Sequence, residues 1–124
     1  MRVDNFIGPV LIVDDNHEVR VRLRLLLERE GYAVFTATDG LMALALMRRL
    51  SLVPRLIVLD LVMPIMDGWE FLDAFRSEPQ WESSIVVIHT SAEKEHLPRG
   101  VARLRKDASD AEILRMARRY CRPE

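Results

Sequence analysis

The chain of 124 residues has one cysteine, few aromatic residues and almost no net charge, and each shortage excludes a class of protein. The lone Cys121 cannot form an internal disulfide, so the reducing cytoplasm is the expected compartment. No apolar run approaches the roughly 20 residues that cross a bilayer. The first residues lack the small-residue cleavage site of a signal peptide. We therefore expect no membrane association.

The chain is rich in the residues that build a core. Hydrophobic residues make up 49% of it, which excludes the disordered and fibrous classes. A chain of this length buries enough surface to fold without disulfides or a structural metal. We expect one compact domain over residues 1–124.

Short apolar runs alternate with amphipathic stretches along the chain. The runs are rich in β-branched residues and bounded by Pro, Gly or Asp, which predicts strands over residues 10–13, 32–37, 56–59, 85–89 and 101–105. Apolar residues at three- and four-residue spacing predict helices over residues 16–30, 39–50 and 69–77, and a last helix from residue 109. Parallel strands need crossover connections, so the alternation predicts an α/β fold, a doubly wound parallel sheet with helices on both faces.

The pattern thins between the fourth and fifth expected strands. Only residues 93–97 separate the fourth strand from Pro98 and Gly100, which leaves room for one or two helical turns. The fourth helix is therefore predicted to be truncated.

Polar side chains follow four of the five expected strands. The first strand ends in Asp14 and Asp15, the third ends at Asp60, Thr90 follows the fourth, and Lys106 follows the fifth. In open α/β sheets the ligand crevice lies at the carboxyl ends of the strands. We therefore expect these five side chains to meet at one edge of the sheet.

Three carboxylates in a shallow crevice form an all-oxygen site, which favours Mg²⁺, with Mn²⁺ as the alternative, over zinc. A phosphoryl group is the natural further ligand, and Asp60 is the candidate nucleophile that receives it. Each residue taken alone has an ordinary explanation: Asp14 could cap a helix, Lys106 could be a surface lysine, and Thr90 a strand residue. Their common position favours the site.

These residues resemble the response-regulator receiver domains of two-component signalling. The resemblance rests on Asp14 and Asp15, on the D-x-x-M-P-x-x-D-G segment that starts at Asp60, and on Thr90 and Lys106, and it covers nearly the whole chain. It implies a flavodoxin-like fold with strand order 2-1-3-4-5. It also implies a phosphoacceptor, not an enzyme with a separate substrate, that receives its phosphoryl group from a histidine kinase or a phosphotransfer protein.

The resemblance implies a role for each acidic residue. Asp60 would be the phosphoacceptor, Asp15 would coordinate Mg²⁺ directly, and Asp14 would act mostly through water. The main-chain carbonyl of Val62 would supply a further metal ligand.

The resemblance also implies that Thr90 moves toward the phosphoryl group and that Lys106 pairs with it. The chain departs from the family in this region. Arg103 stands where the family usually has an aromatic residue, and Asp107 stands where it has proline, so a carboxylate could compete for the charge of Lys106. The interval of 16 residues from Thr90 to Lys106 is short for the family.

Two alternatives stay open. The departures favour a pseudo-receiver, a protein interaction module that does not depend on phosphorylation, whereas the intact acids oppose it. A Mg²⁺-dependent phosphatase that forms an aspartyl phosphate has a similar edge of acids. It is disfavoured because Val62 stands where such an enzyme would carry a second acid.

Charge is uneven along the chain. Residues 94–124 carry nine Lys and Arg against five Asp and Glu. We interpret these cations as a solvated helix face, because no DNA-binding motif accompanies them and nucleic acid is not an expected partner.

His17, His89 and His96 lack metal-ligand spacing and are interpreted as hydrogen-bonded or exposed. We expect a monomer or weak dimer with a downstream protein partner that the sequence cannot name.

Overall fold

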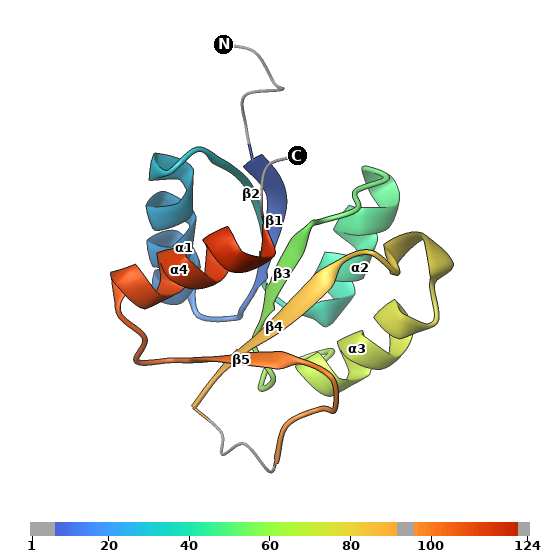
Figure 1. Cartoon of the computed structure of the whole chain (residues 1–124). Helices are drawn as coiled ribbons and strands as arrows, with labels where there is room; N and C mark the ends of the chain where they lie inside the picture. The colour runs from blue at the N-terminus through green and yellow to red at the C-terminus, as the bar shows by residue number, and fades with distance from the viewer. Residues whose placement is uncertain (1–6, 92–95, 122–124) are drawn as a thin grey trace.

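Figure 1 shows the computed structural model, which describes residues 7–91 and 96–121. The strands are β1 (Ile7–Val13), β2 (Tyr32–Ala37), β3 (Leu56–Leu59), β4 (Ile85–Thr90) and β5 (Ala102–Arg105). The helices are α1 (His17–Arg29), α2 (Gly40–Arg49), α3 (Gly68–Arg76), the 3₁₀-helix η2 (Pro79–Trp81) and α4 (Asp110–Tyr120). The strands form one parallel sheet in the order β2-β1-β3-β4-β5.

The doubly wound parallel sheet and its strand order are confirmed. Each expected strand and each of the longer expected helices is present, although β1 begins at Ile7, ahead of the predicted start at residue 10. The described residues contain no α-helix between β4 and β5. The one or two turns predicted over residues 93–97 fall largely on residues 92–95, which lie outside the described part.

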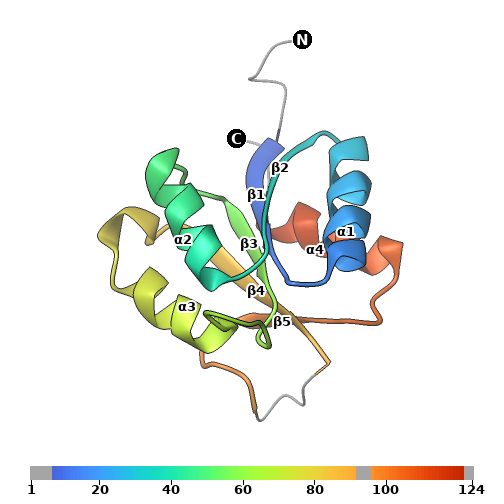
Figure 2. The same cartoon turned by 180° about the vertical axis from the view of Figure 1, so that it is seen from behind.

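Two helical layers cover the sheet, as Figures 1 and 2 show. The α2, α3 and η2 helices pack on one face, where they bury Leu11, Ile57, Leu59, Val86 and Ile88. The α1 and α4 helices pack on the other face, which buries Val10, Ile12, Val58, Val87 and Leu104. Alternate residues of each strand therefore face opposite cores, as the period of two in a strand requires.

Side-chain caps fix where the helices begin. Asn16 accepts a hydrogen bond from the Val19 amide at α1, and Asp39 accepts one from the Met42 amide at α2. Asp67 and Glu70 form a reciprocal capping box at α3. Ser109 accepts from the Glu112 amide at α4. Each cap satisfies an amide that has no partner within its helix and stabilises it by about 1 kcal/mol.

Within the described residues, no helix is both long enough and apolar enough to span a bilayer.

Candidate functional site

The predicted side chains meet at the carboxyl edge of the sheet. Asp14 and Asp15 follow β1, and Asp60 follows β3. Carboxylate oxygens from these three residues lie within 4.8 Å of one another. The Lys106 Nζ, just after β5, is 2.5 Å from Asp14 Oδ2 and 3.7 Å from Asp60 Oδ1. Thr90, the last residue of β4, is hydrogen-bonded through its carbonyl to the Lys106 amide at 3.2 Å.

Burial differs sharply among these side chains. Asp14, Asp60 and Thr90 are only 2%, 7% and 4% exposed, whereas Asp15 is exposed. The site is therefore a crevice whose base is formed by Asp14 and Asp60, with Asp15 at its mouth. A group that enters from solvent meets Asp15 first and Asp60 beneath it.

Burial raises the pKa of Asp60 to about 6. This value is the net of opposing effects: the negative charges of Asp14 and Asp15 also raise the pKa, whereas Lys106 and a backbone hydrogen bond from Val62 lower it. One lysine does not compensate three clustered carboxylates, because like charges at this spacing repel strongly in a partly buried site. An all-oxygen cluster with excess negative charge suits a hard divalent cation such as Mg²⁺. The donor set therefore fits the predicted metal.

Asp14 does not cap a helix. Its Oδ1 accepts a hydrogen bond from the Asn16 amide at 2.9 Å, and its main-chain carbonyl accepts one from Arg20 at 2.8 Å. Asn16 is the residue that caps α1. The carboxylate of Asp14 thus stays directed to Lys106 and the site, and the capping explanation is wrong.

The loop from β3 to α3 is folded tightly against Asp60. The Gly68 amide donates to the Leu61 carbonyl at 2.9 Å, and a Cβ at Gly68 would lie 2.5 Å from the Asp60 carbonyl oxygen. Only glycine fits there. The side chain of Val62 is 81% exposed, and its carbonyl as a metal ligand stays a prediction.

Asp107 does not compete for Lys106. Its Oδ1 lies 3.0 Å from the Nε of Arg105, so the predicted competition is wrong. Arg103 is exposed and lines a small cavity of about 140 Å³ together with Thr90 and Lys106. An arginine thus lies beside Thr90 at the position where the sequence lacks an aromatic residue.

His89 is the residue near the site that sequence reasoning missed. Its side chain is 2% exposed, and neither ring nitrogen has a hydrogen-bond partner among the described residues. The pKa of His89 is lowered to about 4, mainly by burial and also by the positive charges of Lys106 and Arg22, while the negative charge of Asp14 partly opposes this. The expectation of a hydrogen-bonded or exposed histidine is wrong here. The sequence did contain a signal for the burial of His89. Side chains two residues apart in a strand lie on the same face, so His89 lies with Val87 on the face that α1 and α4 cover.

The fold and the crevice match a known family. A family model of the response regulator receiver domain matches residues 10–113, most of the chain. This chain belongs to that family. It is a receiver domain of two-component signalling.

Individual relatives agree with this assignment. A protein of Leptolyngbya boryana, described as a 14.6 kDa protein in the sodA1 3' region, is 33% identical over 90% of this chain and 88% of its own length. Sporulation initiation phosphotransferase F of Bacillus subtilis is 41% identical, over 51% of this chain and 49% of its own length. The chemotaxis response regulator CheY4 of Vibrio cholerae has a TM-score of 0.82 at 28% identity, over 92% of this chain and 98% of its own.

Proposed function

We propose that this receiver domain accepts a phosphoryl group on Asp60 and signals through altered binding to a partner protein. The observation that carries the proposal is the position of the Asp60 carboxylate. It lies at the base of the crevice, with two further acids and the Lys106 ammonium within reach. This arrangement gives one buried nucleophile and a cation beside it.

The transfer requires little proton chemistry. A carboxylate oxygen of Asp60 attacks phosphorus in line, an O–P bond forms, and the N–P bond of a phosphohistidine breaks with its electron pair passing to the imidazole nitrogen. The reaction depends on alignment and on stabilising the charge that spreads over the phosphoryl oxygens. Lys106, whose Nζ lies 3.7 Å from Asp60 Oδ1, and the Thr90 hydroxyl are the groups proposed to meet that charge. The chain acts as acceptor and assists its own phosphorylation, not as an enzyme on a separate substrate.

Asp14, Asp15 and Asp60, with the Val62 carbonyl, are the proposed ligands of Mg²⁺, or of Mn²⁺ as the alternative. When bound, this ion neutralises the acids and the incoming phosphoryl oxygens. Asp15 contributes most directly because it is exposed at the mouth of the crevice, whereas Asp14 is already held by Lys106.

The proposed phosphodonor is a histidine kinase or a phosphotransfer protein. Receiver domains interact with such proteins, and the relative from Bacillus subtilis is named a phosphotransferase. The downstream partner of this chain is a further protein. Phosphorylation needs a coupling free energy of only about 1–3 kcal/mol to change the affinity for that partner by one or two decades.

Intact mass spectrometry after incubation with acetyl phosphate tests the proposal. The wild type, Asp60→Asn and Asp67→Asn are compared, each with Mg²⁺ and with EDTA. Asp67 is a matched control because it lies in the same loop and caps α3, a role that Asn also fills. We expect the wild type and Asp67→Asn to gain one phosphoryl group only with Mg²⁺, and Asp60→Asn to gain none.

The alternative is a pseudo-receiver, which the exposed Arg103 beside Thr90 favours. If the wild type gains no phosphoryl group and calorimetry detects no Mg²⁺ binding, the phosphoacceptor proposal is overturned and the pseudo-receiver is favoured. Equal phosphorylation of Asp60→Asn would also overturn it, because the acceptor would then be another residue.

A further inference from the structure

We propose that the groove between α3 and the β4–β5 side of the sheet binds a small amphipathic monocarboxylate, with its carboxylate at Arg76 and its apolar body over Val86 and Ile85. The ligand is a small molecule, and its binding does not rest on phosphorylation of Asp60. The groove has a volume of about 640 Å³ and lies on the sheet face that α2 and α3 cover elsewhere. Small-molecule sites occupy about 300–1,000 Å³, so the groove has a suitable size.

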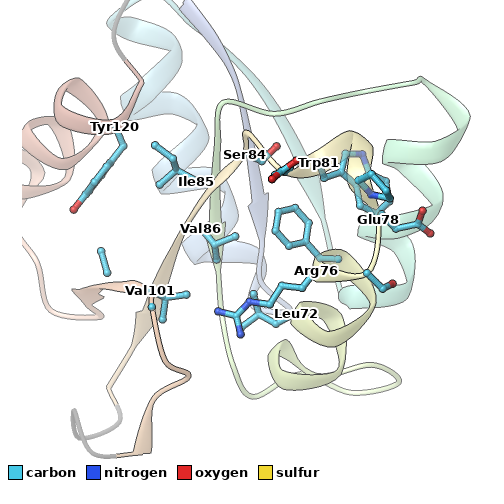
Figure 3. A pocket seen from close by; sticks show the side chains of 15 residues that line it. Leu72, Arg76, Glu78, Trp81, Ser84, Ile85, Val86, Val101 and Tyr120 are labelled. Atoms are coloured by element: carbon cyan, nitrogen blue, oxygen red, sulfur yellow. The ribbon is translucent and has the colours of Figure 1, made fainter.

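Figure 3 shows how the groove is built. Leu72 of α3 and Trp81 of η2 form one wall, while Val101 beside β5 and Tyr120 of α4 stand across from them. Val86 of β4 lies between these walls. The lining is therefore mostly apolar, and it is assembled from elements that are far apart in the chain.

The groove exists because β5 lacks a helical cover on this face. The described residues contain no α-helix between β4 and β5, and α4 packs on the opposite face. Both faces of a parallel sheet are normally covered by helices. The strands β4 and β5 therefore form an open floor beside α3, and a hollow remains where a helix would otherwise pack.

The depth of the apolar lining favours a small ligand over a protein surface. Leu72 and Trp81 are each 2% exposed and Val86 is 8% exposed, whereas Ile85, at 39%, is the most exposed large hydrophobic residue of the lining. A protein laid across the rim reaches little of this surface, and a stable protein interface buries about 800 Å² on each partner. A slender molecule that enters the groove contacts the sunken side chains directly.

One end of the groove carries a cation that no acid neutralises. The Arg76 guanidinium donates a hydrogen bond to the Arg99 carbonyl at 2.8 Å, and Figure 3 shows it extending from α3 toward Val101. In the part of the chain that the structure describes, no carboxylate pairs with Arg76. A guanidinium has five N–H donors in a planar fork that matches a carboxylate, so several donors remain for a ligand. A carboxylate is therefore the head group that this end of the groove selects.

The acids of the lining fix the orientation of the ligand. They are Glu78 and Glu82, which flank η2, and Figure 3 places Glu78 well away from the Arg76 guanidinium. Glu78 is paired with Arg48 at 3.1 Å, whereas Glu82 is exposed. A negative head group is disfavoured beside η2, because like charges repel there. The carboxylate therefore lies at Arg76, and the apolar body extends toward η2.

Three small probes test the proposal against the full chain without phosphodonor. Octanoate, octanol and octylammonium share one apolar chain, and their head groups are negative, neutral and positive. Titration of the ¹⁵N-labelled chain, followed by NMR, reports both the affinity and the residues affected. We expect octanoate to shift the amides of Val86, Val101 and Ala102 saturably. Octanol and octylammonium should bind about tenfold more weakly, since they lack the charge-assisted hydrogen bonds to Arg76.

Variants separate the head-group contact from the apolar lining. Arg76→Gln should weaken octanoate about tenfold and leave octanol unchanged, because only the charge is lost. Arg76→Glu should reverse the preference, so that octylammonium binds better than octanoate. Val101→Trp fills the groove and should weaken octanoate and octanol alike. Arg49→Gln removes an exposed cation at the end of α2, away from the groove lining, and is the matched control that should leave binding unchanged.

Equal binding of octanoate and octanol, or undiminished octanoate binding by a folded Arg76→Gln variant, would overturn the proposal. Absence of any saturable shift at the groove residues would overturn it as well. Shifts confined to the crevice would assign octanoate to Lys106 instead, and the groove site would again be wrong. Asp60→Asn should bind octanoate as the wild type does, so failure of phosphorylation and failure of ligand binding are told apart.

Discussion

His89 shows what a single buried imidazole does to stability. The pKa of His89 is about 4 in the folded chain, whereas an unfolded chain has the ordinary value of 6.5. The unfolded state therefore binds a proton first as pH falls. Titration of His89 therefore costs no stability above pH 6.5 and lowers the free energy of unfolding as pH falls from 6.5 toward 4.

We predict that His89→Leu raises the free energy of unfolding at both pH 7.5 and pH 5. At pH 7.5 the gain is about 1 kcal/mol, since two ring nitrogens without partners are replaced by apolar atoms. At pH 5 the gain is about 3 kcal/mol, because protonation of unfolded His89 no longer opposes folding. Urea unfolding at the two pH values measures both. A gain that does not grow at pH 5 would mean that His89 is protonated in the fold.

The backbone is strained at Ile65, in the loop between β3 and α3. Its φ is 68°, in the left-handed region that β-branched residues avoid, and the Met66 amide donates to the Pro64 carbonyl at 2.7 Å across it. The Ile65 side chain is 76% exposed, so it has little packing to offset the strain.

We predict that Ile65→Gly raises the free energy of unfolding by about 0.5–1 kcal/mol, because glycine adopts this conformation without strain. Val62→Gly is the control, as Val62 lies in the same loop, is similarly exposed and has no positive φ. It should lower stability through the entropy of the unfolded chain. Thermal unfolding compares the two, and destabilisation by Ile65→Gly would contradict the assigned strain.

At the scale of elements, the start of α3 is set by contact with the end of β3. A Cβ at Gly68 would lie 2.5 Å from the Asp60 carbonyl oxygen and 2.7 Å from the Leu61 Cα. Both are backbone atoms, so no side chain can rotate away. The helix therefore cannot approach Asp60 this closely with any residue but glycine at this position.

We predict that Gly68→Ala lowers the free energy of unfolding by about 3 kcal/mol, the cost of forcing packed backbone apart. The same change should slow phosphorylation by acetyl phosphate, because Asp60 moves with its own carbonyl. Gly100→Ala is the control for loss of conformational freedom, since Gly100 has a φ of 75° and open space around it. It should cost about 1 kcal/mol and leave the phosphorylation rate unchanged.

The elements themselves were readable from the sequence because their signals are local. The acids after Val13 and the stop at Gly31 lie close to the ends of β1 and α1, although β1 begins at Ile7, ahead of the apolar run, and the acids at strand ends predicted the crevice. Local signals do not report what a side chain meets across the fold. The burial of His89 and the groove beside Val101 depend on contacts between distant segments. The pairing of Asp107 with Arg105 is local, but it depends on side-chain conformations that residue spacing does not fix. These were the features that the sequence could not supply.

At the scale of the whole molecule, the crevice lowers stability. The folded chain holds Asp60 at a pKa of about 6, above the ordinary value of 3.8, so the folded state binds a proton more tightly than the unfolded state. Without metal, this group favours folding below pH 3.8, and that advantage is lost as pH rises through 6. The loss is about 2–3 kcal/mol and runs opposite to the effect of His89.

We predict that the effect of Asp60 on the pH dependence of stability can be measured alone in the His89→Leu variant, which lacks the titrating imidazole. In EDTA, this variant should lose stability as pH rises from 4 to 7, whereas His89→Leu with Asp60→Asn should show a flatter profile. Mg²⁺ should restore stability at pH 7 and have little effect at pH 4.5, because a protonated Asp60 is a poor ligand. Urea unfolding with Mg²⁺ and with EDTA measures each case. Equal stabilisation of the Asp60→Asn variant by Mg²⁺ would show that the ion binds outside the crevice, since Asp60 lies at its base.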